Sequence, residues 1–147
     1  MNKTAAALGL AFALFFDIAA AQTPAAPEPT GLWRVADGTA VVRISHCGAG
    51  LCGFIAAAPP PEPGKASSVG KKILIDMRRQ IDPGPQAESW RGRIFNLEDG
   101  KTYDGEISLK SADRLKIKGC IVGGGACGGE TWRREAAKAS SLKRPSR

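Results

Sequence analysis

The sequence predicts an all-β protein, a small closed antiparallel up-and-down barrel of about eight strands. Between residues 31 and 134, most apolar residues alternate with polar ones at a period of two, as in half-buried strands. Most breaks between these runs carry Gly, Pro, Asp or Asn, which are turn residues. No stretch in this range offers a convincing amphipathic helix. Short strands with hairpin-sized connections favour a sheet closed on itself, because closure removes exposed edges.

Eight runs of the sequence are expected to form the strands. In chain order they are GLWRV, AVVRISHC, LCGFIAAA, KKILID, WRGRIFNL, TYDGEISL, LKIKGC and ETWRR. The third run ends at three consecutive prolines, which a central strand does not contain because proline has no backbone N–H to donate. The Pro- and Gly-rich segment from Ala56 to Glu88 is therefore expected to be less regular and to cover one mouth of the barrel.

The alternation also predicts which side chains point inward, because residues two positions apart in a strand share a face. In WRGRIF, for example, Trp90 and Ile94 lie opposite Arg91 and Arg93. Glycines share the inward faces and leave room either for tight strand bending or for a ligand cavity. The residues expected to line the interior and bind a ligand are Trp33, Val42, Ile44, Ile55, Trp90, Ile94, Tyr103, Ile107 and Ile117.

The N-terminus has the pattern of a secretory signal peptide: a positive charge at Lys3, an apolar run from Ala5 to Phe16 and small residues at Ala19–Ala21. The run is shorter than the ~20 residues of a membrane span, and no later segment is long enough to be one. We expect a cleaved signal peptide over 1–21, a Pro/Ala-rich linker over 22–30, the barrel domain over 31–134 and a basic, disordered tail over 135–147. The mature protein is then periplasmic or secreted.

Four cysteines are expected to form two disulfides in that oxidising compartment. Cys47 and Cys52 bracket one glycine-containing turn, and Cys120 and Cys127 bracket another. Cysteines that face each other across a hairpin are close enough to be bridged, so we predict the pairs Cys47–Cys52 and Cys120–Cys127. Neither spacing is that of a redox C-x-x-C motif. The alternative, a zinc site made from all four cysteines, lacks the tighter pairs such sites use.

The formal net charge of +7 indicates attraction to anionic partners. For an exported protein, the expected anionic partner is an envelope surface. Nucleic acid is not expected as a partner, because the aromatic residues that would stack on bases, Trp90 and Tyr103, fall on the predicted inward face.

The sequence offers little for catalysis, and we expect no enzyme activity and no cofactor. The single histidine, His46, lies beside Ser45 on a predicted strand, so the two side chains point to opposite faces. A carboxylate pair for acid–base chemistry is Asp104 and Glu106, but both fall on the predicted outer face. Cross-strand ion pairing with Arg and Lys is the expected use of that pair.

An ordered set of motifs resembles the bacterial envelope family catalogued as domain of unknown function 2147. The most specific pieces are Gly31-Leu32-Trp33, Cys47 with Cys52, Gly100-Lys101-Thr102-Tyr103 and Thr131-Trp132. The resemblance implies a lipocalin-like barrel with no established activity. The Gly-x-Trp of the first strand is also similar to the lipocalin signature, which implies that Trp33 closes the barrel base under Arg133 or Arg134.

These observations favour a secreted or periplasmic binding protein that holds a small hydrophobic or amphipathic ligand inside the barrel. The alternative is a filled barrel that acts as an envelope interaction protein through its basic surface and tail. An interior cavity of roughly several hundred Å³ favours the first function, and a solidly packed interior favours the second.

Overall fold

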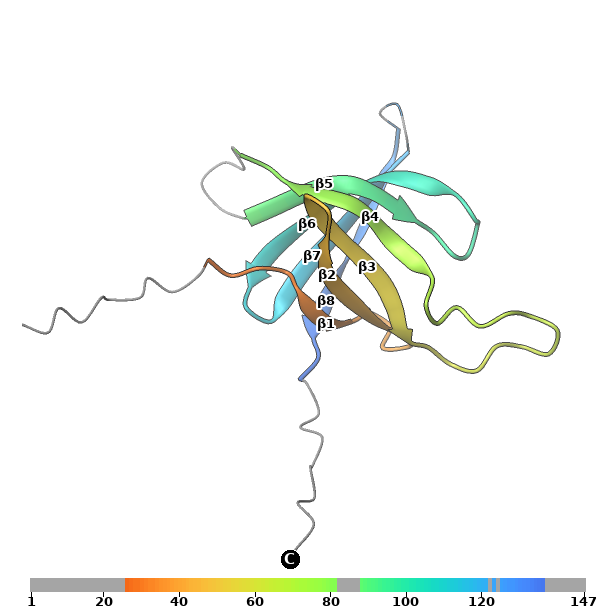
Figure 1. Ribbon diagram of the computed structural model, residues 1–147. Coiled ribbons are helices and arrows are strands. Elements are labelled where there is room, and N and C mark those ends of the chain that lie inside the picture. Colours follow the sequence, from red (N-terminus) through yellow and green to blue (C-terminus); the bar gives the residue numbers. More distant parts are fainter. Residues whose placement is uncertain (1–25, 82–87, 122, 124, 137–147) are drawn as a thin grey trace, which may run out of the picture.

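The computed structural model describes residues 26–81, 88–121, 123 and 125–136, which form one closed barrel of antiparallel strands (Figure 1). Each strand pairs with its successor, and β8 pairs with β1. The predicted all-β, up-and-down order is therefore confirmed. The predicted signal peptide and residues 137–147 of the predicted tail lie outside the described residues. The strands are β1 (Gly31–Arg34), β2 (Val41–Cys47), β3 (Gly50–Ala57), β4 (Lys72–Arg79), β5 (Glu88–Phe95), β6 (Thr102–Ser111), β7 (Arg114–Cys120) and β8 (Cys127–Arg134).

The connections between strands alternate between two ends of the barrel, which we call the base and the mouth. The base carries the tight β2–β3 turn, the segment between β4 and β5, and the β6–β7 turn at Ala112 and Asp113. The mouth carries the β1–β2, β3–β4, β5–β6 and β7–β8 connections, which together are longer. This difference makes the base the compact end of the barrel.

The half of the barrel next to the base is solidly packed. Its side chains come from nearly every strand, and the least exposed of them are Trp33, Val42, Ile44, Leu74, Met77, Ile107 and Leu115, at 2% exposure or less. They form one apolar cluster with Trp90 and Trp132. The alternation predicted most of this set, because apolar residues two apart on a strand point into the same core.

Trp33 closes the base under an arginine, as the resemblance to lipocalins implies. The Arg134 guanidinium lies 4.3 Å from the centre of the Trp33 ring, a cation–π geometry. Arg134 also donates hydrogen bonds to the carbonyls of Thr30 and Ala112, at 2.6 and 2.5 Å. The Trp33 indole N–H donates to the carbonyl of Pro29 at 2.8 Å. One buried ring therefore ties the N-terminal segment, β1 and β8 together.

Residues on either side of the range 31–134 pack against the base of the barrel. Pro29, which we placed in a linker, is fully buried beneath Trp33. Glu135, which we placed in the tail, forms an ion pair with Arg34 at 2.9 Å and donates its backbone N–H to Leu32. Both contacts are made with residues of β1, which is only four residues long.

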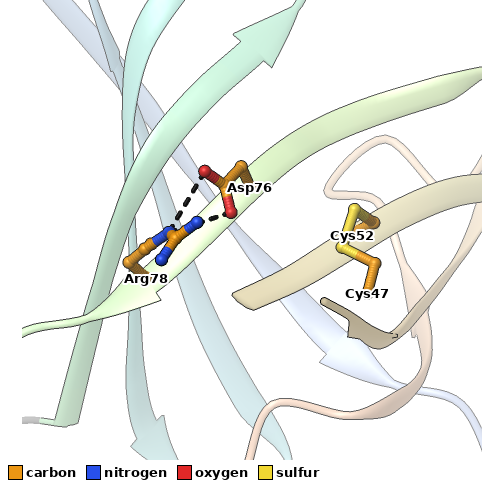
Figure 2. Close-up of a disulfide and its surroundings, with 4 residues drawn as sticks. All are labelled: Cys47, Cys52, Asp76 and Arg78. Atoms are coloured by element: carbon orange, nitrogen blue, oxygen red, sulfur yellow. Dashed lines mark hydrogen bonds and ion pairs between the residues drawn. A yellow bond between two sulfur atoms is a disulfide. The ribbon is translucent and has the colours of Figure 1, made fainter. Parts of the chain in front are cut away.

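Strand β4 is irregular where it passes the Cys47–Cys52 disulfide (Figure 2). Its pairing with β5 shifts register between Ile75 and Arg78, and Asp76 adopts a positive φ of 47°, as in a β-bulge. Arg78 holds the Asp76 carboxylate with bonds of 3.0 and 3.1 Å from its Nε. The bulge brings the Asp76 carboxylate close to Gly50 of the β2–β3 hairpin. A Cβ added to Gly50 would lie 2.9 Å from an oxygen of that carboxylate.

The Pro-rich segment does not cover the mouth, and that prediction is wrong. Figure 1 shows the β3–β4 connection running away from the barrel, and residues 59–67 are all exposed. Within the range Ala56–Glu88, residues 72–79 form β4, and residues 82–87 lie outside the described residues. The connection has almost no apolar side chain with which to pack on the mouth, since its one large apolar residue, Val69, is 48% exposed.

Candidate functional site

The mouth half of the barrel contains a cavity of about 570 Å³. Its walls come from the β1–β2 turn, β3, β4, the end of β5, β6, β7 and the first half of β8. Near this cavity, β1 pairs with β8 at only two positions, Trp33 with Arg134 and Arg34 with Arg133. The barrel is thus packed at its base and has an open pocket at its mouth, and the pocket's walls Ile55, Ile73 and Ile117 also belong to the buried core.

A row of four directly paired glycines crosses the barrel wall from β5 to β8. Gly92 pairs with Gly105, Gly105 with Gly119, and Gly119 with Gly128. A Cβ on Gly92 would lie 2.5 Å from the Ile75 carbonyl oxygen, and one on Gly105 would lie 2.4 Å from the Ile94 side chain. These two positions therefore need glycine, because any side chain would clash with the neighbouring strand. A Cβ on Gly119 would have its nearest neighbour at 3.8 Å, and one on Gly128 would meet nothing within 4 Å.

The two uses of glycine considered from the sequence therefore occur in one row. The half of the row on β5 and β6 allows close packing, while the half on β7 and β8 borders the cavity. The absence of side chains at Gly119 and Gly128 leaves part of the cavity volume open. A side chain placed at Gly128 would enter the cavity.

The nine residues expected to bind a ligand divide between the two halves of the barrel. Ile55, Ile94, Tyr103 and Ile117 line the cavity. The other five, which do not line it, pack in the filled half and are at most 4% exposed: Trp33, Val42, Ile44, Trp90 and Ile107. The sequence pattern marks a side chain as inward but does not say at which height in the barrel it lies, which is why both groups were predicted together.

The structure adds lining residues that the sequence analysis did not propose. Ile73 and Trp132 contribute apolar surface, and Phe95 contributes a second ring. Three carboxylates, those of Asp37, Glu98 and Glu130, also line the cavity. Glu130 could have been found by extending the last strand back to Cys127, because the Cys120–Cys127 pairing sets the register of the β7–β8 hairpin.

The two predicted disulfides are present in the described chain and hold opposite ends of the barrel. Cys47–Cys52, with a Cα separation of 5.7 Å, joins the ends of β2 and β3 at the base. Cys120–Cys127, with a Cα separation of 4.1 Å, joins β7 to β8 beside the cavity. The second bond fixes the start of the strand that carries Gly128 and Glu130.

Tyr103 is held against the cavity wall by a carboxylate from the β5–β6 turn. Its hydroxyl donates a hydrogen bond to Asp99, which also accepts the backbone N–H of Lys101 at 2.8 Å. The bond lowers the pKa of the Asp99 carboxyl and raises the pKa of the Tyr103 hydroxyl above its ordinary value of about 10. The phenol therefore stays neutral and fixed across the physiological range.

We predict that Asp99→Asn lowers the pKa of Tyr103 toward its ordinary value of about 10, because the neutral amide no longer opposes formation of the phenolate. Tyr103 is the one tyrosine of the chain, so the ultraviolet absorbance of tyrosinate reports it alone. Asp113→Asn, a change of the same kind at the base, is the control and leaves the titration unchanged. Identical midpoints in Asp99→Asn and the wild type would show that the bond does not hold the ring.

The other groups considered for chemistry lie away from the cavity. His46 is exposed on β2 near the base, where it pairs with Glu28 at 3.1 Å. Glu106 forms a cross-strand ion pair with Arg91 at 2.8 Å on the outer face, which confirms the expected use of that carboxylate. Asp104 is exposed two residues earlier on β6, directly opposite Arg93. In the described part of the chain, no helix has the length and apolarity needed to cross a membrane.

Together the fold and the site define a class of protein: a small up-and-down β-barrel, closed at its base by a Trp–Arg pair and with an open pocket at its mouth. Residues 31–134 match the bacterial family described as "Uncharacterized protein conserved in bacteria (DUF2147)", and the chain belongs to that family. A search of curated proteins and a search of solved structures found no significant match.

Proposed function

We propose that this protein binds a small hydrophobic or amphipathic molecule in the hollow half of its barrel. The observation that carries the proposal is the cavity of about 570 Å³ next to a solidly packed base. Its volume falls within the ~300–1,000 Å³ of small-molecule sites. Its deeper walls are apolar, formed by Ile55, Ile73 and Ile117 among others. Burial of an apolar ligand there yields about 25 cal/mol per Å² removed from water.

The proposal places the protein in the periplasm or outside the cell. The signal-peptide pattern of residues 1–21 supports export. Two disulfides among the described residues, with no cysteine left free, support an oxidising compartment. An exported barrel with a half-open interior is suited to carrying a poorly soluble molecule between surfaces.

We further propose that the protein binds its ligand without transforming it. The histidine–glutamate pair of His46 and Glu28 lies at the base, on the exposed outside of the barrel. At the cavity, the hydrogen bonds of Tyr103 and Trp132 go to Asp99 and Glu130, respectively. Each of these bonds joins the ring of an aromatic residue to a carboxylate. Neither one pairs a serine or cysteine nucleophile with a base, as covalent catalysis requires.

The test fills the cavity with one added side chain. Gly128→Leu places a leucine where a Cβ meets nothing within 4 Å, so we expect a stable barrel that binds the uncharged fluorescent probe N-phenyl-1-naphthylamine at least about tenfold more weakly, a loss of about 1.4 kcal/mol. Thr131→Leu adds the same side chain on the outer face of β8, where Thr131 is exposed, and is expected to bind like the wild type. Equal binding by both variants, or no binding by the wild type, would contradict the proposal.

A second function, envelope interaction, is favoured by a row of arginines on the outside of the base. Arg34 pairs with Arg133, which pairs with Arg114. Like charges directly opposite each other destabilise a sheet, and an anionic surface would relieve that repulsion. Arg34 has an ion pair with Glu135, whereas within the described residues Arg114 and Arg133 have none closer than 4 Å.

We predict that the double variant Arg114→Ser/Arg133→Ser loses most binding to phosphatidylglycerol vesicles at low salt, because surface attraction to anionic lipid scales with the number of basic groups. Cosedimentation measures it. Lys65→Ser/Lys72→Ser, which removes the same charge near the β3–β4 connection, is the matched control and keeps its binding. A uniform loss in both variants would mean that net charge, not this row, is responsible.

A further inference from the structure

The cavity carries a charge of the sign opposite to that of the whole protein. The chain has 21 Lys and Arg against 14 Asp and Glu. Among the described residues that line the cavity, however, there are three carboxylates, Asp37, Glu98 and Glu130, and no Lys, Arg or His. They come from the β1–β2 turn, the β5–β6 turn and β8, so three separate parts of the mouth contribute one acidic residue each.

Within the described residues, none of these three carboxylates forms an ion pair. The ion pairs of the described chain use other acidic residues, such as Glu106, Glu28 and Glu135. Asp37 accepts hydrogen bonds from the backbone N–H and hydroxyl of Thr39, which lower the pKa of its carboxyl. Glu130 accepts the indole N–H of Trp132. Thr39 and Trp132 are neutral donors, so neither partner brings a positive charge to these carboxylates.

Aromatic rings line the same cavity and add an attraction of the same sign. Phe95, Tyr103 and Trp132 all belong to its wall. The face of an aromatic ring attracts a cation, and rings combined with carboxylates are the groups that recognise ammonium and quaternary ammonium ligands. The hydrogen bonds from Tyr103 to Asp99 and from Trp132 to Glu130 fix two of these rings in place.

We infer that the ligand is an organic cation: an amine or quaternary ammonium group attached to an apolar body. This inference rests on the proposed function and names the class of molecule that the cavity takes. The apolar body lies among Ile55, Ile73 and Ile117, and the cationic group lies at the acidic and aromatic mouth. A fatty acid in the same position would bring its carboxylate against three others with no basic residue of the described wall to receive it.

The basic exterior works against this preference at long range and therefore limits its size. At about 150 mM salt the Debye length is about 8 Å, so charges on the outer faces are largely screened from the cavity. The three carboxylates border the cavity itself, and all three are exposed to solvent, which also limits the preference. A preference of about tenfold for a cation over a matched anion is a reasonable expectation at that salt concentration.

The experiment displaces N-phenyl-1-naphthylamine from the wild type with three ligands of the same chain length, each below its micelle-forming concentration. The ligands are decyltrimethylammonium, decanol and decanoate. We expect decyltrimethylammonium to displace the probe at about one tenth of the concentration that decanoate needs, with decanol between them. Equal midpoints for the three ligands, or a preference for decanoate, would overturn the inference while leaving the proposed function in place.

A matched pair of double variants locates the charge that is responsible. Glu98→Gln/Glu130→Gln removes two charges from the cavity, and we expect it to reduce the preference for the cation at least threefold. Asp104→Asn/Glu106→Gln removes two charges from the outer face of β6 and is expected to keep it. If both variants lose the preference equally, the net charge and not the cavity selects the ligand, and the inference fails. If the wild type binds neither the probe nor decanol, the proposed function itself fails.

Discussion

Trp33→Ala is expected to cost about 3 to 5 kcal/mol of unfolding free energy, because it removes a large side chain from a tightly packed site. Trp33 has no solvent exposure, stacks under Arg134 and holds the carbonyl of Pro29. For a domain of this size, that loss corresponds to a fall of roughly 15 to 30 °C in melting temperature. Thermal unfolding followed by circular dichroism measures it.

Trp33→Phe separates the role of ring packing from that of the indole hydrogen bond. Phenylalanine keeps a ring beneath the Arg134 guanidinium but loses the N–H that bonds Pro29, together with part of the volume of the indole. We expect a smaller loss of about 1 to 2 kcal/mol, the cost of a buried carbonyl left without its donor. A Trp33→Ala protein that melts within a few degrees of the wild type would show that the Trp–Arg pair does not hold the base closed.

Loss of both disulfides is the second large effect. Each bond closes a short loop, with the cysteines 5 and 7 positions apart in the chain. Loop-closure entropy then gives about 2 to 2.5 kcal/mol for each, and about 4 to 5 kcal/mol for the two together. We expect reductant to lower the unfolding free energy of the wild type by that amount. The loss is measured as a fall in the urea midpoint.

Two double variants assign the disulfide effect to each end of the barrel. Cys47→Ala/Cys52→Ala is expected to cost more than Cys120→Ala/Cys127→Ala, because Cys52 is buried and Cys127 is exposed. The variant that lacks all four cysteines is the control and shows no response to reductant. An unchanged urea midpoint for the wild type in reductant would rule out a stabilising role for either bond.

Much of the fold could be predicted because apolar and polar residues in the strands β5, β6 and β7 alternate with a period close to two. Trp90, Ile107 and Ile117 were predicted to point inward and are all buried. The disulfides could be predicted for a related reason, because a hairpin turn places its two flanking cysteines opposite each other. In both cases neighbours in the chain decide the structure, so a local pattern is sufficient.

Strand β4 shows where a local pattern fails. In KILIDM, buried residues stand next to each other at Ile73 and Leu74 and recur at Met77, which fits neither a helix nor an even strand. The bulge at Asp76 resolves this spacing by shifting the register against β5. That bulge requires Gly92 on the neighbouring strand, where a Cβ would meet the carbonyl oxygens of Ile75 and Asp76. A contact between strands is therefore what sets the pattern.

The three carboxylates at the mouth could not be predicted because contacts between distant parts of the chain bring them together. Asp37 lies 61 positions before Glu98, and Glu98 lies 32 positions before Glu130. They stand in two turns and a glycine-rich strand, where single charges are ordinary. Only closure of the barrel brings them to one cavity. The height at which each inward side chain lies is also a property of the closed barrel, and it decides that Ile55 lines the cavity while Ile44 belongs to the packed core.

The most direct test of a hollow mouth above a packed base uses the isoleucine methyl groups as probes of position. In a titration of methyl-labelled protein with N-phenyl-1-naphthylamine, we predict that the NMR signals of the cavity residues shift progressively and saturably, while those of Ile44 and Ile107 in the packed half stay in place. The cavity residues to follow are Ile55, Ile73, Ile94 and Ile117. Shifts confined to the exposed residues Ile81 and Ile121, or no shifts at all, would contradict a ligand site inside the barrel.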